Sequence, residues 1–114
     1  MDKVKFPETL RKFRGHNFYP PKADLKKIPN LYSTEDTPLD DKIIYIHYFG
    51  SSQDWYIAEL DQGTGLAFGY ADLGFGMGEW GEIYLPEIEA VKGQFIPIER
   101  DLSFTPQKAS EVIK

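Results

Sequence analysis

A glycine-rich segment in the second half of the chain carries its most recognisable chemical motif. Residues 76–81 (GMGEWG) match the pattern G-x-G-x-x-G, and Glu99 and Asp101 follow about twenty residues later. In dinucleotide-binding proteins this pattern follows a strand and opens a helix, whose N-terminus holds the pyrophosphate. Here the next residues, EIYLP, favour a strand that ends at Pro86. The motif therefore indicates a glycine loop with unusual backbone angles rather than a nucleotide site.

Arg100 is the second residue with unusual chemistry, because it interrupts the alternating segment QFIPIERDLSF. Alternation places Arg100 on the same strand face as Ile98 and Leu102, so its side chain is expected to point toward the apolar face. A buried guanidinium needs a partner, and a carboxylate that accepts two hydrogen bonds suits it best. The candidate carboxylates on neighbouring strands are Glu59, Glu79 and Glu82. We expect a structural ion pair between Arg100 and Glu59; the alternative is an anion or phosphate clamp.

Carboxylates offer a second kind of chemistry. Glu99 and Asp101 share the other face of the Arg100 strand, where two carboxylates can share a cation. With a further carboxylate from the preceding strands, and Arg100 on a phosphate, they would form a metal-assisted hydrolase or nuclease site. Their spacing does not require this, and exposed strand acids are the commoner explanation. We assign no catalytic residue, no metal and no cofactor.

Histidine and cysteine chemistry is restricted by composition. The chain has no cysteine, which excludes disulfides, thiolate zinc sites and cysteine nucleophiles. Its two histidines are too few for a zinc site built mainly from imidazoles. His47 lies within the apolar segment YIHYF and is expected to be a strand histidine with satisfied hydrogen bonds.

Residues 54–85 favour recognition of a protein partner. They contain both tryptophans and no lysine or arginine. Aromatic side chains often anchor partners, although about half of those here are needed for the core of a small domain. We expect Trp80 to be exposed, on an acidic surface that complements a basic partner. The predicted partner-binding residues are Tyr32, Glu35, Phe75, Glu79, Trp80 and Glu82.

Charge is divided unevenly along the chain. The first 27 residues contain eight lysines and arginines against three acids, whereas residues 28–114 contain five against fifteen. Such a division is typical either of a basic arm that binds nucleic acid or of a basic segment that packs on its own acidic body. Four apolar residues of the segment favour the second interpretation, because they need burial: Phe6, Leu10, Phe13 and Phe18. The alternative nucleic-acid contacts are Lys3, Lys5, Arg11, Lys12, Arg14, Lys22, Lys26 and Lys27.

The elements that would position these residues are short. A helix is expected from Pro7 to Gly15, followed by an irregular stretch to residue 30. Apolar and aromatic alternation predicts strands at residues 42–49, 54–60, 66–71, 80–85 and 94–104. Short helices are expected to begin at Pro86 and at Thr105-Pro106. This order predicts an α+β fold, a mostly antiparallel sheet of about five strands with two or three short helices, and the two longer helices on one face.

Length and hydropathy bound the class of protein. The 114 residues suit a single domain, in which residues 1–27 form a basic helix and wrap and residues 28–114 form the α+β body. No apolar run approaches the roughly 20 residues that cross a bilayer. The charged N-terminus lacks the apolar stretch of a signal peptide, so we expect a cytoplasmic protein.

Several ordered motifs resemble one family. They include LYSTED at residues 31–36, PLDDKIIYIHYF at 38–49, DWYIAELD at 54–61, GLAFGY at 65–70, LPEIEAV at 85–91 and PIERDLSFTP at 97–106. From about residue 28 to residue 111 the chain resembles the bacterial Domain of Unknown Function 2958 family. The resemblance implies a small cytoplasmic protein associated with plasmids, phages and other mobile elements, and it carries no activity. Together with the acidic aromatic surface, it leads us to expect a non-enzymatic interaction or regulatory module, with partner and oligomeric state open.

Overall fold

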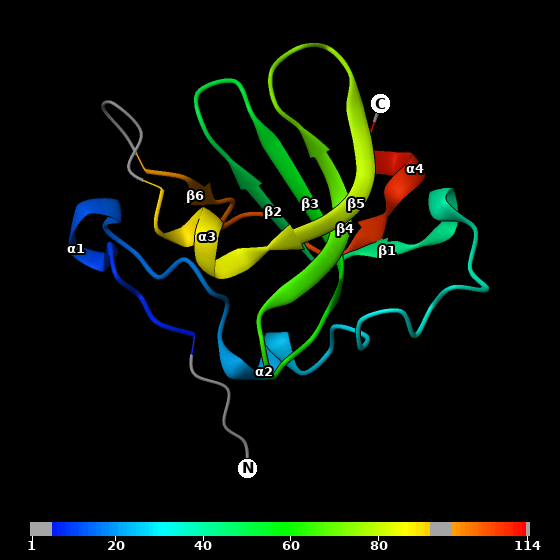
Figure 1. Ribbon diagram of the computed structural model, residues 1–114, viewed down its shortest axis with the longest axis horizontal. Coiled ribbons are helices and arrows are strands. Elements are labelled where there is room, and N and C mark those ends of the chain that lie inside the picture. Colours follow the sequence, from blue (N-terminus) through cyan, green and yellow to red (C-terminus); the bar gives the residue numbers. More distant parts are fainter. Residues whose placement is uncertain (1–5, 92–96, 114) are drawn as a thin grey trace.

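A five-stranded antiparallel sheet forms the centre of the protein. The computed structural model describes residues 6–91 and 97–113 (Figure 1). The strand order is β5-β4-β3-β2-β6, and each neighbouring pair is antiparallel. The strands are β2 (Ile46–Phe49), β3 (Asp54–Leu60), β4 (Leu66–Asp72), β5 (Gly78–Tyr84) and β6 (Glu99–Arg100). A separate two-stranded sheet pairs β1 (Ile43–Ile44) with β7 (Gln107–Lys108).

Short helices surround the sheet. They are α1 (Arg11–Arg14), α2 (Lys22–Leu25), the 3-10 helix η1 (Leu39–Asp41), α3 (Leu85–Glu89) and α4 (Ala109–Val112). The predicted α+β class, with a mostly antiparallel sheet and short helices, is confirmed. Among the described residues, none of these helices has the length and apolarity that crossing a membrane requires.

One face of the sheet, the core face, carries the hydrophobic core. Alternation along the strands turns the apolar side chains Ile46, Tyr48, Trp55, Ile57, Ala67 and Ile83 toward it. The N-terminal segment covers these residues with Phe18, Tyr19, Leu25 and Ile28. The basic segment thus packs on the acidic body rather than forming a free arm.

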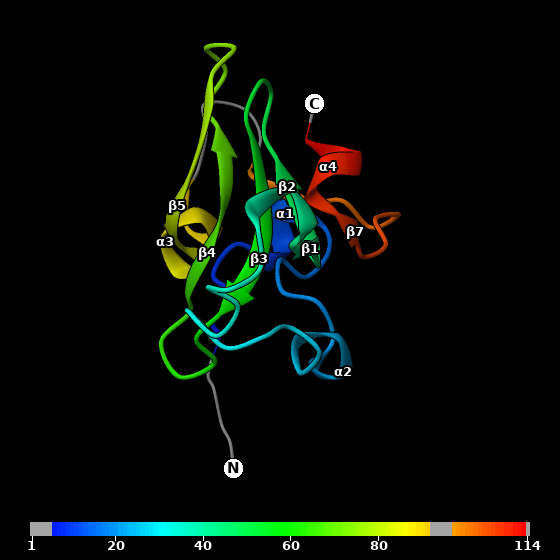
Figure 2. The ribbon, with the colours of Figure 1, turned by 90° about the vertical axis from the view of Figure 1, so that its right-hand side faces the viewer.

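The opposite face, the aromatic face, is covered only in part. Its residues alternate with those of the core face and include His47, Tyr56, Tyr70 and Trp80, which lie opposite one another across the strands. Ala109 of α4 packs on this face in a smaller cluster with Ile44 and Ala58. In Figure 2, α4 lies at the upper right beside β2, and α2 lies at the lower right. The expectation that both helices cover one face is wrong. Arg14 of α1 lies over the ring of Phe18, which belongs to the core-face cluster, whereas Ala109 of α4 belongs to the cluster on the aromatic face.

Several predicted elements are shorter than expected because tertiary contacts compete with local patterns. The expected helix from Pro7 begins only at Arg11 and ends, as predicted, at Gly15, whose φ of 91° is left-handed. Its first turn is lost because the Leu10 N–H donates to Glu89 instead. The predicted strand over 42–49 is interrupted at Tyr45. The part before Tyr45 is β1 and the part after it is β2, and the two belong to different sheets.

The C-terminal elements differ most from the prediction. Residues 94–96 of the expected strand lie outside the described residues. The remainder pairs with β2 at Glu99 and Arg100, and the Asp101 N–H donates to the His47 carbonyl. The side chain of Asp101 then accepts the Ser103 N–H, which turns the chain. The helix expected from Thr105 begins at Ala109, because Gln107 and Lys108 pair with β1.

Candidate functional site

Aromatic rings form a continuous row across the aromatic face. Trp80 stacks on Phe68, with ring centroids 5.7 Å apart, and meets Tyr70 edge-on at 5.6 Å. Tyr70 in turn lies 6.3 Å from Tyr56. All four rings are half-buried, and Tyr56 and Trp80 also pack on the α4 cluster. The expectation that Trp80 is simply exposed is therefore wrong: its strand phase places it within this row, where it has a packing role.

Tyr32 and Glu82 meet at one end of this row. The Tyr32 hydroxyl donates to the Glu82 carboxylate, joining the loop before β1 to strand β5. Tyr32 has a φ of 67°, which is uncommon for a residue with a side chain. Its N–H donates to Glu59 at 2.6 Å, and the Thr34 hydroxyl also donates to Glu59. A buried carboxylate thus holds Tyr32 in position beside the row.

Glu59 pairs with Lys42, and the predicted ion pair between Arg100 and Glu59 is wrong. The Lys42 Nζ lies 3.4 Å from the Glu59 carboxylate, and both side chains are buried. A β-bulge between Ile57 and Glu59 shifts the register and turns Glu59 to the aromatic face, opposite Phe68. Arg100 lies opposite Tyr48 and so belongs to the core face, as its phase predicts. Its Nε donates to the Asn17 carbonyl at 3.2 Å.

His47 lies between two carboxylates at the other end of the row. Its Nε2 is 2.7 Å from Asp54 and its Nδ1 is 3.1 Å from Asp101, while its ring stacks on Tyr56 at 4.7 Å. Both nitrogens are engaged, as expected of a satisfied strand histidine, so neither is free to act on a substrate. Burial, followed by the charges of Asp54 and Asp72, raises the pKa of Tyr56 above its ordinary value.

The acids proposed for metal binding are held separately. Glu99 contacts His16 Nε2 at 3.0 Å, and Asp101 contacts His47. In residues 6–91 and 97–113, no group of three or more His, Cys, Asp or Glu side chains is arranged to hold a metal ion. The geometry therefore does not unite Glu99, Asp101 and Arg100 at one site.

Among residues 6–91 and 97–113, the tip of the β4–β5 hairpin carries the most exposed large apolar side chains. Leu73, Phe75 and Met77 are 49%, 80% and 77% exposed, in a loop that projects at the top of Figure 1. Gly74 and Gly76 separate them with φ values of 97° and 76°, so these two glycines serve a turn, whereas Gly78 and Gly81 of the predicted glycine loop lie within strand β5. The sequence prediction included Phe75 but missed Leu73 and Met77. Their alternation with glycine in LGFGM was the available signal.

The other predicted partner-binding residues are spread out. Glu79 is exposed but has the phase of the core face, opposite Ala71. Glu35 is exposed in the turn-rich loop before η1. The structure therefore brings together Tyr32, Trp80 and Glu82, places Phe75 at the adjoining tip, and leaves Glu35 and Glu79 at the margins.

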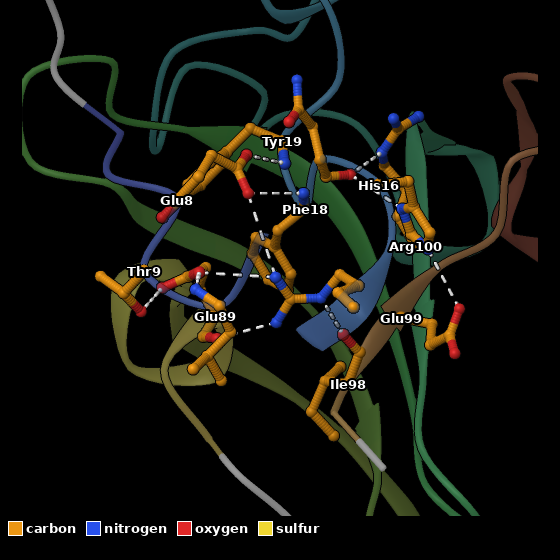
Figure 3. Close-up of polar contacts among 12 residues, drawn as sticks. Glu8, Thr9, His16, Phe18, Tyr19, Glu89, Ile98, Glu99 and Arg100 are labelled. Carbon is orange, nitrogen blue, oxygen red and sulfur yellow. Dashed lines mark hydrogen bonds and ion pairs between the residues drawn. The ribbon is translucent and has the colours of Figure 1, made fainter. Parts of the chain in front are cut away.

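The basic segment is only partly available to a nucleic acid. Arg11, Lys12, Lys22, Lys26 and Lys27 are exposed, whereas Lys3 and Lys5 lie outside the described residues. Arg14 is buried, and its side chain contacts Glu89 and the Ile98 carbonyl. Figure 3 shows Glu89 and Ile98 together with Glu8 and Thr9 in this polar cluster. Glu8 joins this cluster by accepting the N–H groups of Phe18 and Tyr19. Arg14 therefore attaches the segment to the body, and its buried guanidinium is not accessible to a phosphate group.

Comparison with protein-family models gives one match, described as a protein of unknown function (DUF2958), over residues 28–112. No curated protein and no solved structure matches the chain. The family match starts within the N-terminal wrap, so the segment that contributes Phe18 and Tyr19 to the core precedes it.

Proposed function

The chain belongs to the family of proteins of unknown function DUF2958, and we propose that it acts as a non-enzymatic protein-interaction module. The observation that carries this proposal is the exposed apolar tip of the β4–β5 hairpin, formed by Leu73, Phe75 and Met77. Contiguous apolar side chains exposed on a projecting loop are typical of an interaction site. Aromatic and methionine side chains are also enriched in the buried centres of interfaces.

The tip continues into the aromatic face, which enlarges the proposed surface. Tyr70 and Trp80 lie just below it on β4 and β5, and the ring of Tyr70 crosses Gly78. Farther from the tip, the hydrogen bond from the Tyr32 hydroxyl to the Glu82 carboxylate lies at the end of the row. A partner that received Phe75 in a pocket would therefore meet rigid, partly buried rings beside it. Such pre-positioned anchors lose little conformational freedom on binding.

Charge indicates the kind of partner. Asp72, Glu79 and Glu82 border the tip and the row, and residues 54–85 contain no lysine or arginine. An apolar pocket with a basic rim would complement this surface, and the charges would mainly speed association and select the partner. We place the interaction in the cytoplasm of a bacterium, as a regulatory step of a plasmid, phage or other mobile element. The resemblance described above supports this placement, and the genes that neighbour this one would test it.

The test is site-specific crosslinking in the native host. A photoreactive phenylalanine analogue at Phe75 is expected to join the chain to a discrete protein, and the same analogue at Leu102 is the control. Leu102 is also exposed but lies in the turn after β6, away from the hairpin. The F75S/M77S variant should lose the same partner in affinity capture, while L102S should retain it.

The variants separate binding from folding. Phe75 and Met77 contribute little to the core because they are exposed, so F75S/M77S should unfold at the same temperature as the parent protein. Trp80 is unsuitable for this purpose, because its removal would also disturb the row and the α4 cluster. Identical partners for the parent protein and F75S/M77S would overturn the proposal.

A further inference from the structure

A groove lies on the N-terminal side of the molecule, away from the hairpin tip. It has a volume of about 650 Å³ and is formed almost entirely by residues 6–30, with Gln62 from the β3–β4 turn. This volume falls within the range of roughly 300–1,000 Å³ that is typical of small-molecule sites. Most of the groove thus comes from the segment that precedes the family match.

The walls of the groove are apolar and firmly held. Phe6 stacks on Tyr19, with ring centroids 4.6 Å apart, and Leu25 and Ile28 belong to the core. Pro20 and Pro21 add inflexible wall residues. Gln62 donates to the Leu25 carbonyl at 2.8 Å, which ties the β3–β4 turn to α2. These contacts preform the groove, so a ligand need not organise it.

The charged groups of the groove favour an anion. Lys22 and Lys26 line it four residues apart, a spacing that puts both on one side of the α2 turn. In the described part of the chain the ion pair near this helix is Lys27–Asp24, and neither Lys22 nor Lys26 has a carboxylate within 4.0 Å. Glu8, the acid that lines the groove, already accepts the N–H groups of Phe18 and Tyr19.

We propose that this groove binds a small amphipathic anion, with its apolar body between Phe6, Tyr19 and Leu25 and its anionic head at Lys22 and Lys26. Apolar walls provide the burial that a ring or short chain needs, and the two ammonium groups select the charge of its head. The site is distinct from the protein-interaction surface, and it gives the N-terminal segment a role besides completing the core.

The test is a titration of the isotope-labelled full chain, followed by the backbone amide signals in ¹⁵N–¹H NMR spectra. Three probes separate the components of recognition: 4-phenylbutyrate has the apolar body and the negative head, 4-phenylbutylamine has the same body with a positive head, and inorganic phosphate has the charge alone. We expect 4-phenylbutyrate to bind most tightly and to shift signals of residues 17–30 and Gln62.

Charge-reversal variants test whether the anionic head of the ligand binds at Lys22 and Lys26. K22E/K26E is expected to weaken 4-phenylbutyrate binding at least about tenfold, equivalent to ~1.4 kcal/mol. R11E/K12E makes the same change of charge on α1, outside the groove, and should leave binding within about twofold. All four side chains are exposed, so both variants should keep the dispersed spectrum of the folded chain.

Three patterns of binding would overturn the proposal. They are equal binding of the amine and the carboxylate, equal losses in the two double variants, and signal shifts confined to residues outside the groove. Absence of any shift with millimolar 4-phenylbutyrate would overturn it as well.

Discussion

Arg14 and Glu89 form a buried ion pair that joins the N-terminal segment to α3. The Arg14 Nη1 lies 3.4 Å from Glu89 Oε2, and the two side chains are 0% and 1% exposed. Each partner has further hydrogen bonds: Arg14 Nη2 donates to the Glu89 carbonyl at 2.8 Å, and the Thr9 hydroxyl donates to Glu89 Oε1 at 2.7 Å. Burial of a charge is tolerated when its hydrogen bonds are this complete.

Removing one partner of this pair should destabilise the protein strongly. We expect R14M to lower the free energy of unfolding by about 3–5 kcal/mol, because Glu89 is left as an unpaired buried charge. Urea denaturation measures the change. K27M breaks the exposed Lys27–Asp24 pair and should change stability by less than about 0.5 kcal/mol. If R14M and K27M had the same free energy of unfolding, the Arg14–Glu89 pair would not be what holds the N-terminal segment to α3.

Phe18 should matter far more than Phe13, although both belong to the N-terminal segment. Phe18 is buried and stacks on Tyr48, with ring centroids 4.1 Å apart and an interplanar angle of 9°. F18A should therefore cost about 3–5 kcal/mol, the usual loss for a phenylalanine in a core. The expected burial of Phe13 is wrong, because its side chain is half-exposed, so F13A should cost less than about 1 kcal/mol. Comparable thermal unfolding of the two variants would contradict this account of the core.

The central hairpins could be predicted because their signals are local. Alternating apolar residues and a glycine-containing turn give β3 at Asp54–Leu60, as expected, and set the register of β4 against it. The packing of the N-terminal segment on the body was also predictable from Phe18 and Leu10. Both inferences depend only on residue type and spacing, which the sequence contains.

The partners of charged residues could not be predicted in the same way. The bulge between Ile57 and Glu59 turns Glu59 to the opposite face, and nothing in the alternation of DWYIAEL reveals it. Because the bulge shifts the alternation by one residue, the Glu59 carboxylate forms its ion pair with Lys42 and not with Arg100. The short α4 and β7 likewise depend on pairing with β1, more than sixty residues away in the chain. Such contacts exist only after the chain has folded.

Two glycines of β5 should respond differently to alanine. A Cβ at Gly78 would overlap the ring of Tyr70, whereas a Cβ at Gly81 would meet no atom within 4 Å. G78A should therefore displace Tyr70 from Trp80 and cost about 1–3 kcal/mol. G81A should be neutral or slightly stabilising, because alanine restricts the unfolded chain more than glycine does. Chemical denaturation together with the near-ultraviolet circular dichroism of the rings would measure both effects. Unchanged ring signals in G78A would contradict the packing of Tyr70 over Gly78.

Buried phenols should make the protein unstable in alkali. Burial raises the pKa of Tyr48 well above its ordinary value of 10.0, and it raises that of Tyr19 as well. Above pH 10 the unfolded chain therefore releases phenolic protons that the folded chain retains, so stability falls as pH rises. Each such tyrosine contributes a slope of about 1.4 kcal/mol per pH unit.

Tyr48→Phe isolates one of these contributions. In the described residues the Tyr48 hydroxyl has no hydrogen-bond partner, so its removal should cost no stability at pH 7. Above pH 10, Y48F should lose stability less steeply than the parent protein, by about 1.4 kcal/mol per pH unit. Urea denaturation at a series of pH values measures the slope, and Y84F, which removes an exposed hydroxyl, controls for the loss of a phenol. An alkaline slope that Y48F leaves unchanged would show that Tyr48 is not a source of this instability.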